Sequence, residues 1–202
     1  MLLSAILLTV QFTKAQSSAM KDPVTFKLKN GMTVIVAENS EATKVFAGFT
    51  SDSRLSASVN KPGVQELLLA MMNSNLLRLD STLTYTEKGG NINTDAGHFD
   101  KALELLSSAL KHPLFSQKDL DNARNELIGS LEANNRYFPD GISKTSLGAL
   151  NMQDVNVLYD AIMVPSKSFL TIVGNIRVSE AKLLAKKSLG NWKGSSSLEI
   201  AK

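Results

Sequence analysis

An alternation of apolar and polar residues on both sides of an Asn-Gly pair is the feature that most restricts the fold of this chain. It occupies residues 24–37, which read V-T-F-K-L-K-N-G-M-T-V-I-V-A. A period of two is typical of a strand with one buried face, and Asn30-Gly31 accepts the positive φ angles of a type I′ turn. The segment therefore predicts a β-hairpin and an antiparallel component in the sheet.

Strand and helix patterns follow one another in separate groups along the chain. Residues 45–50 predict a third strand, and residues 169–173 predict a late, buried strand. Helices are expected from Gly63 onward, over 99–110, 116–134 and 152–162, and from Ser179 to Gly190, whereas 76–85 read as two strand-like or irregular pieces. Because strands and helices segregate, we expect an α+β fold with a mostly antiparallel sheet and helices packed on one face.

The predicted elements define a single domain over residues 24–193, with a linker at 16–23 and a polar tail at 194–202. Residues 1–15 have the pattern of a signal peptide, because an apolar run is followed by small Thr13 and Ala15, although no cation follows Met1. A buried N-terminal helix or strand is the alternative. The signal peptide predicts a periplasmic or secreted protein, and the run is too short for a stable membrane span.

Composition and charge exclude several kinds of site. The net charge is only +3 and the cations are scattered, so we expect no binding to nucleic acid. The absence of cysteine excludes disulfides, thiolate metal sites and cysteine nucleophiles. His98 and His112 are the only histidines, and they stand in a predicted turn and at a predicted helix end, without the spacing of a zinc-binding pair.

Four segments, taken in order, are similar to the motifs of one peptidase family. They are L-K-N-G-M-T-V-I-V at 28–36, E-K-G-G-N-I-N-T at 87–94, H-P-L-F at 112–115 and V-P-S-K-S-F-L-T-I-V-G-N-I at 164–176. Together they resemble the insulinase/pitrilysin-type zinc peptidases and their processing-peptidase relatives. In that family the second segment is a strand edge that pairs with extended substrate. The resemblance spans about residues 24–193 and implies a peptidase-like α+β domain.

The resemblance also implies an H-x-x-E-H motif on the helix that follows Gly63. Two histidines at i and i+4 bind zinc there, and the glutamate activates the zinc-bound water. These three positions fall on Glu66, Leu69 and Ala70 in this sequence. The third family ligand, a glutamate on a later helix, aligns with Ser130, and Glu126 and Glu132 lie nearby in the sequence. Because leucine and alanine neither ligate a metal nor accept a proton, we expect no catalytic residues, no metal site and no zinc cofactor.

The resemblance and the missing ligands lead to one main hypothesis and two alternatives. We expect a catalytically inactive homologue that acts as a binding or structural partner of a homologous subunit, of another copy of itself, or of an extended peptide. The edge predicted to receive the peptide by strand addition is Gly90, Asn91, Ile92, Asn93 and Thr94. The first alternative is an active metal-dependent peptidase with a displaced site built from Glu66, Glu126 or Glu132 and a histidine. The second is a decayed remnant with a marginal core.

Overall fold

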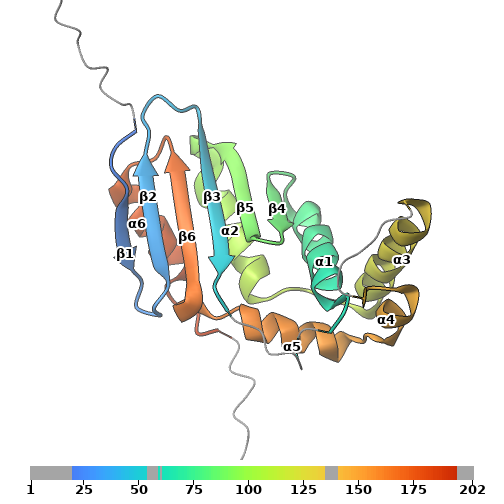
Figure 1. The fold of residues 1–202 in the computed structure, drawn as a ribbon. Coiled ribbons are helices and arrows are strands. Elements are labelled where there is room, and N and C mark those ends of the chain that lie inside the picture. Colours follow the sequence, from blue (N-terminus) through green and yellow to red (C-terminus); the bar gives the residue numbers. More distant parts are fainter. Residues whose placement is uncertain (1–19, 54–58, 60, 135–140, 195–202) are drawn as a thin grey trace, which may run out of the picture.

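The computed structural model describes residues 20–53, 59, 61–134 and 141–194 (Figure 1). The predicted signal peptide at 1–15 and residues 195–202 of the tail lie outside the described residues, so those predictions stay open. Part of the predicted linker joins the sheet, because Met20 forms a bridge with Asn39 and the Lys21 N–H donates to the Glu38 carbonyl oxygen at 2.9 Å.

One mixed sheet lies at the centre of the fold. Within the described residues it has six strands, in the order β1-β2-β6-β3-β5-β4 (Figure 1). The strands are β1 (Val24–Lys27), β2 (Thr33–Glu38), β3 (Lys44–Ser51), β4 (Leu83–Thr86), β5 (Gly89–Asp95) and β6 (Ser168–Gly174). The neighbours are antiparallel except β2 and β6, which are parallel. The prediction of an α+β fold with a mostly antiparallel sheet is confirmed.

The hairpin predicted around Asn30-Gly31 is confirmed as the β1–β2 pair, but its turn differs from the predicted type. The Leu28 N–H donates to the Met32 carbonyl oxygen at 2.9 Å, which leaves a three-residue loop instead of a two-residue type I′ turn. Gly31 closes this loop with a φ of 88°, a left-handed conformation that glycine adopts without steric cost.

The side chain of Asn30 has a structural role that its turn propensity does not reveal. Its amide nitrogen donates to the carbonyl oxygens of Leu189 and Trp192, at 2.8 and 2.9 Å. Leu189 is the last residue of the final helix and Trp192 follows it, and both are far from Asn30 in the sequence. Asn30 therefore fastens the first hairpin to the C-terminal part of the domain.

The late strand predicted at 169–173 is confirmed as β6, and it lies at the centre of the sheet. It enters between β2 and β3, so that Ile172 has Val36 on one side and Ala47 on the other. Leu170 and Ile172 point toward the helices and are fully buried. β6 therefore joins two parts of the chain that are distant in the sequence.

The described α-helices largely follow the sequence patterns. They are α1 (Val64–Leu79), α2 (Phe99–Lys111), α3 (Gln117–Asn134), α4 (Lys144–Ala149), α5 (Met152–Ile162) and α6 (Val178–Leu189). The prediction for 76–85 was wrong, because α1 continues through Leu79 and only β4 is extended. Leu76 holds this last turn in place, since its side chain is buried and its carbonyl accepts from the Asp80 N–H at 2.9 Å. The last helix starts after Arg177 instead of at Ser179, and it ends before Gly190 as predicted.

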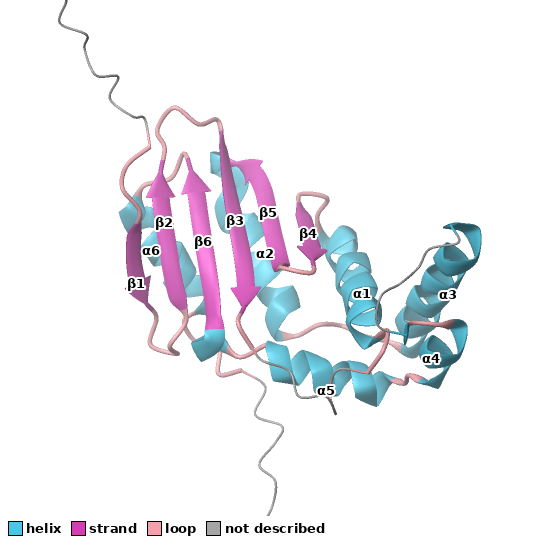
Figure 2. Cartoon of the chain, in the orientation of Figure 1, coloured by secondary structure: helices cyan, strands magenta, loops and turns pink. Residues whose placement is uncertain are grey.

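The helices occupy two places relative to the sheet (Figure 2). α2 and α6 cover one face, where α2 contacts β5, α6 contacts β2, and the two helices contact each other. α1 lies beside β4 and also contacts α2, α3 and α5, so the helical layer continues beyond the β4 edge of the sheet. The core therefore lies between the sheet and α2 and α6, and extends under α1.

The Gly89-Gly90 pair lets three elements approach one another closely. A Cβ atom on Gly89, which has a φ of 120°, would lie 2.0 Å from the Phe49 carbonyl oxygen of β3. A Cβ atom on Gly90 would lie 2.8 Å from Leu106 Cδ1 of α2. The pair thus allows the β3 backbone and helix α2 to pack closely against β5.

The opposite face of the sheet carries no helix among the described residues. Its central side chains are largely uncharged, and two are large and apolar: Phe46 is 53% exposed and Phe169 is 37% exposed. Phe46 pairs with Val173 on one side and with Asn93 on the other. This surface, the open face, is defined by Thr33, Ile35, Phe46, Thr50, Thr84, Asn91, Asn93, Phe169, Thr171 and Val173.

Asp119 fixes the start of α3 and ties this helix to α1. Its carboxylate accepts from the Ser116 N–H at 2.9 Å and from the Ser116 hydroxyl at 2.7 Å, and the Ser116 hydroxyl oxygen accepts from the Asp119 N–H at 3.2 Å. Arg78 of α1 donates to the same carboxylate at 2.8 Å. The hydrogen bond from Arg78, followed by those from Ser116, lowers the pKa of Asp119 from 3.8 to about 2.

We expect Asp119→Asn to lower the free energy of unfolding at pH 7 by about 1–2 kcal/mol, since Arg78 is half exposed and its ion pair is partly screened. A carboxylate whose pKa is lower in the folded state than in the unfolded state stabilises the fold fully at pH values above the unfolded-state pKa. The difference between variant and wild type should therefore shrink as the pH falls from about 4 to about 2. Urea titrations across this range measure it. Asp121→Asn, which removes the pair with Arg124 on the same helix, is the matched control. If the variant and the wild type differed in free energy of unfolding by the same amount at pH 7 and at pH 2, ionised Asp119 would not be the source of the stabilisation.

Candidate functional site

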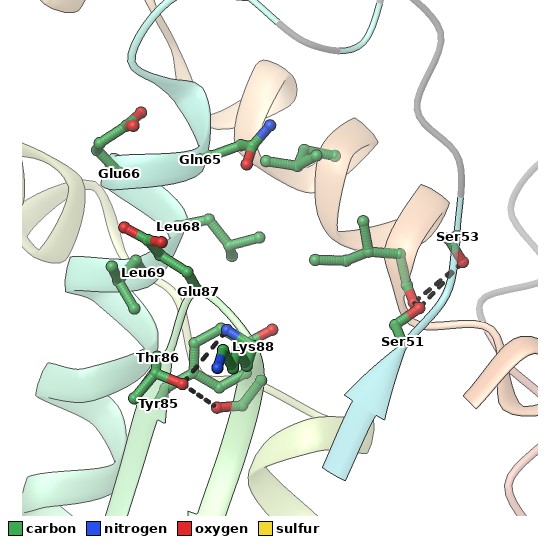
Figure 3. Close-up of a pocket in the computed structure, with 13 residues that line it drawn as sticks. Ser51, Ser53, Gln65, Glu66, Leu68, Leu69, Tyr85, Thr86, Glu87 and Lys88 are labelled. Atoms are coloured by element: carbon green, nitrogen blue, oxygen red, sulfur yellow. Dashed lines mark hydrogen bonds between the residues drawn. The ribbon is translucent and has the colours of Figure 1, made fainter. Parts of the chain in front are cut away.

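The candidate site is a hollow of about 380 Å³ where α1, the β4–β5 turn, the end of β3 and α5 meet (Figure 3). Its apolar wall is formed by Leu68, Leu69, Leu158 and Ile162. Its polar groups include Ser51, Glu66, Tyr85, Glu87 and Lys88. Figure 3 shows Glu66 and Leu69 coming from α1 and Tyr85, Glu87 and Lys88 coming from β4 and its turn. The hollow thus combines an aliphatic side with carboxylates and a single amine.

The three positions implied by the zinc motif lie on α1 as expected, but they face two different hollows. Glu66 and Leu69 line the candidate site. Ala70 lines a neighbouring hollow on α1, and Glu126 of α3 lines that same hollow. α3 thus places Glu126 in the wall of the hollow that Ala70 lines, one helical turn before Ser130, the position that aligns with the third family ligand.

The residues present do not fit a zinc ion. Leu69 and Ala70 offer no ligand atom, and Glu132 is paired instead with Lys144 at 3.3 Å. The part of the chain that the structure describes contains no group of three or more His, Asp or Glu side chains arranged to hold a metal ion. A catalytic zinc site needs three protein ligands and an open position, so the geometry gives zinc chemistry no support at this site.

The histidines of the displaced-site alternative are separated by a whole helix. His98 ends the short 3₁₀ turn before α2, and His112 is the C-terminal cap of α2. The intervening helix has 13 residues and is therefore about 20 Å long. The structure does not bring the two imidazoles together, and each has the position that turn and helix-end patterns predicted.

The hydroxyl groups of the candidate site are not activated as bases or nucleophiles. Burial raises the pKa of Tyr85 to about 12, so its hydroxyl stays protonated at neutral pH. The Ser51 hydroxyl donates to the Ile162 carbonyl oxygen, and the Ser53 hydroxyl approaches the same oxygen at 3.5 Å. Ser51 is therefore bonded to a backbone carbonyl instead of to a carboxylate that could act as its general base.

The edge predicted to receive a peptide, Gly90, Asn91, Ile92, Asn93 and Thr94, was wrongly placed. These residues belong to β5, which pairs with β3 on one side and with β4 on the other. The Asn93 N–H also donates to the Thr82 carbonyl oxygen at 3.1 Å. Their backbone groups are used within the sheet, because β4 adds one more strand outside β5. The alternating L-T-Y-T at 83–86 was the sequence signal for this strand.

Comparison with known proteins identifies the fold. No family model matches the chain, and no curated protein matches it by sequence. Among solved structures, the chain is similar to a protease from Helicobacter pylori, with a TM-score of 0.73, 14% identity, and coverage of 90% of this chain and 53% of that one. An inactive M16 peptidase domain from Pseudomonas fluorescens gives a TM-score of 0.67 and 17% identity, with coverage of 90% and 53%.

A third similar structure is the periplasmic protease PqqL from Escherichia coli, with a TM-score of 0.70, 12% identity, and coverage of 89% of this chain and 25% of that one. The chain thus spans about half of the first two proteins and a quarter of the third. These likenesses show that the chain has the fold of an M16 peptidase domain, as the resemblance to the insulinase/pitrilysin type implied.

The described helices include none that is both long and apolar enough to cross a lipid bilayer.

The position of Glu126 can be tested by building the family motif into α1. We expect the triple variant Glu66→His, Leu69→Glu and Ala70→His to bind about one zinc ion per chain, because i and i+4 imidazoles share a helical face and Ala70 lines the same hollow as Glu126. Isothermal titration with zinc measures the affinity. Adding Glu126→Gln should weaken binding by roughly tenfold or more, whereas adding Glu132→Gln should not. If Glu126→Gln and Glu132→Gln weakened zinc binding equally, Glu126 would not be the third ligand.

Proposed function

We propose that this chain is a non-catalytic domain of the M16 peptidase fold that acts as a binding partner. The observation that carries the proposal is the state of α1. Its buried face is intact, with Leu67, Leu68, Met71 and Met72 all in the core, while Leu69 and Ala70 stand where a general base and a zinc ligand would be required. The helix therefore serves packing, and the hollow beside it is a surface for contact.

Zinc content and cleavage distinguish this proposal from the active alternative. We expect the purified chain to contain far less than one zinc ion per molecule and to cleave no peptide in a chelator-sensitive manner. Elemental analysis and a fluorogenic peptide assay, with and without chelator, measure both. Glu66→Gln should leave both results unchanged, because Glu66 alone cannot hold a catalytic metal. Stoichiometric zinc together with chelator-sensitive cleavage that Glu66→Gln abolishes would support a displaced active site instead.

We propose that the partner is a second domain of the same fold and that it contacts the open face. Phe46 and Val173 form the apolar centre of this face, with Thr84 and Asn93 around a hollow of about 600 Å³. Uncharged polar groups around exposed aromatic residues are typical of non-obligate protein interfaces. The similar proteins from H. pylori and P. fluorescens are about twice as long as the region that matches this chain, which leaves room for a second domain in each.

We expect the chain to form a dimer at micromolar concentration and Phe46→Asp to shift it to monomer. A carboxylate at the centre of the face would be desolvated without a partner in the dimer, which weakens association by roughly tenfold or more. Sedimentation velocity over a concentration series measures the shift. Leu183→Asp is the matched control, because Leu183 is 65% exposed on α6, away from the open face. A wild-type chain that stays monomeric at every concentration would contradict pairing between copies.

The location of the protein follows from the N-terminal pattern and stays a proposal. We propose that residues 1–15 direct the chain to the periplasm or out of the cell. PqqL, which has a domain of the same fold, is a periplasmic protease. The proposed contact with a second domain of the same fold would then form outside the cytoplasm.

A further inference from the structure

The free edge of the sheet beyond β5 is β4, and its backbone is already occupied. In an antiparallel pair, every second residue directs both its N–H and its C=O away from the neighbouring strand. Tyr85 is such a residue: it stands opposite Gly90 of β5, and its two backbone groups bond to Asn73 of α1. The groups that an added strand would use at Tyr85 are therefore taken within the chain.

Asn73 satisfies both groups with a single side chain. Its Oδ1 accepts from the Tyr85 N–H at 2.6 Å, and its Nδ2 donates to the Tyr85 carbonyl oxygen at 2.5 Å. A side-chain amide offers one acceptor and two donors, so it can reproduce the pair of bonds that a peptide group of a neighbouring strand would make. Asn73 thus imitates one residue of an added strand.

The position of Asn73 also determines where the candidate site ends. The hollow lies between the first turns of α1, at Glu66 and Leu69, and the β4–β5 turn, at Glu87 and Lys88. Asn73 comes one helical turn after Leu69 and joins α1 directly to β4. An added strand would need about 4.8 Å of space beside β4 along its length, and the Asn73 bridge occupies that space at Tyr85.

We propose that Asn73 closes the β4 edge, so that a partner polypeptide reaches the hollow only as a side chain or a chain end and cannot continue along β4 as an added strand. The closure lies within one chain and does not depend on whether the chain lacks catalysis or forms dimers. It also leaves β1 as the sheet edge at which a partner strand could be added.

Hydrogen exchange at single amides tests the closure. We expect the Tyr85 amide of the wild type to exchange slowly although β4 has no outer strand. Asn73→Ala should speed this exchange by roughly tenfold or more. The Thr84 and Thr86 amides, on the residues that flank Tyr85 and belong to the β5 pair, should stay protected in the same spectra, which verifies that the variant is folded. Ser74→Ala, an exposed change on the next residue of α1, is the matched control and should have no effect.

A peptide probe tests the consequence for binding. An acetylated, amidated hexapeptide of alternating threonine and valine would be titrated into each protein, with the Leu83 and Tyr85 amide shifts followed by NMR. We expect no change at these amides in the wild type and in Ser74→Ala, and saturable shifts in Asn73→Ala. Shifts of equal size in the wild type would show that a strand displaces Asn73 and would overturn the proposal. An absence of shifts in folded Asn73→Ala would overturn it as well, because α1 itself would then be the barrier.

Discussion

The packing of α1 is the interaction on which the rest of the structure depends. Its buried side chains contact β4, α2, α3 and α5, so this helix joins the sheet to the helical layer beyond the β4 edge. The requirement for apolar side chains on that face is independent of any metal. Leu69 and Ala70, at the ligand positions, are partly buried and pack against the same core, so these apolar replacements leave the fold intact.

Local patterns in the sequence predicted the elements whose signals are local. The β1–β2 hairpin, β3, α2, α3 and α5 follow from periodicity and caps, and each has its predicted type. The end of α1 was missed, because the segment around Leu76 lacks a clear period, and β4, with only four residues, was predicted no more precisely than as strand-like or irregular. The three-residue loop at Gly31 was missed for a different reason: Asn30 is used by α6, and no local rule reports such a distant partner.

The candidate site was predicted in part, on the side that belongs to α1. Glu66 and Leu69 line the hollow because helical spacing fixed their side of the helix. The contributions of Ser51, Tyr85 and Ile162 depend on how β3, β4 and α5 come together, which one sequence does not reveal. The error in the strand edge has the same origin, because the position of residues 90–94 in the sheet depends on β4 lying outside β5.

The place of β6 has a consequence for how the chain acquires its structure. β2 and β3 are separated in the sheet by a strand that comes after α5, so both keep an unpaired inner edge until residues 168–174 are available. Contacts between such distant segments form slowly, and unpaired central strands promote aggregation. A nascent chain, or one truncated before Ser168, would need protection by a chaperone. The same delay would suit a polypeptide that must cross a membrane before it folds.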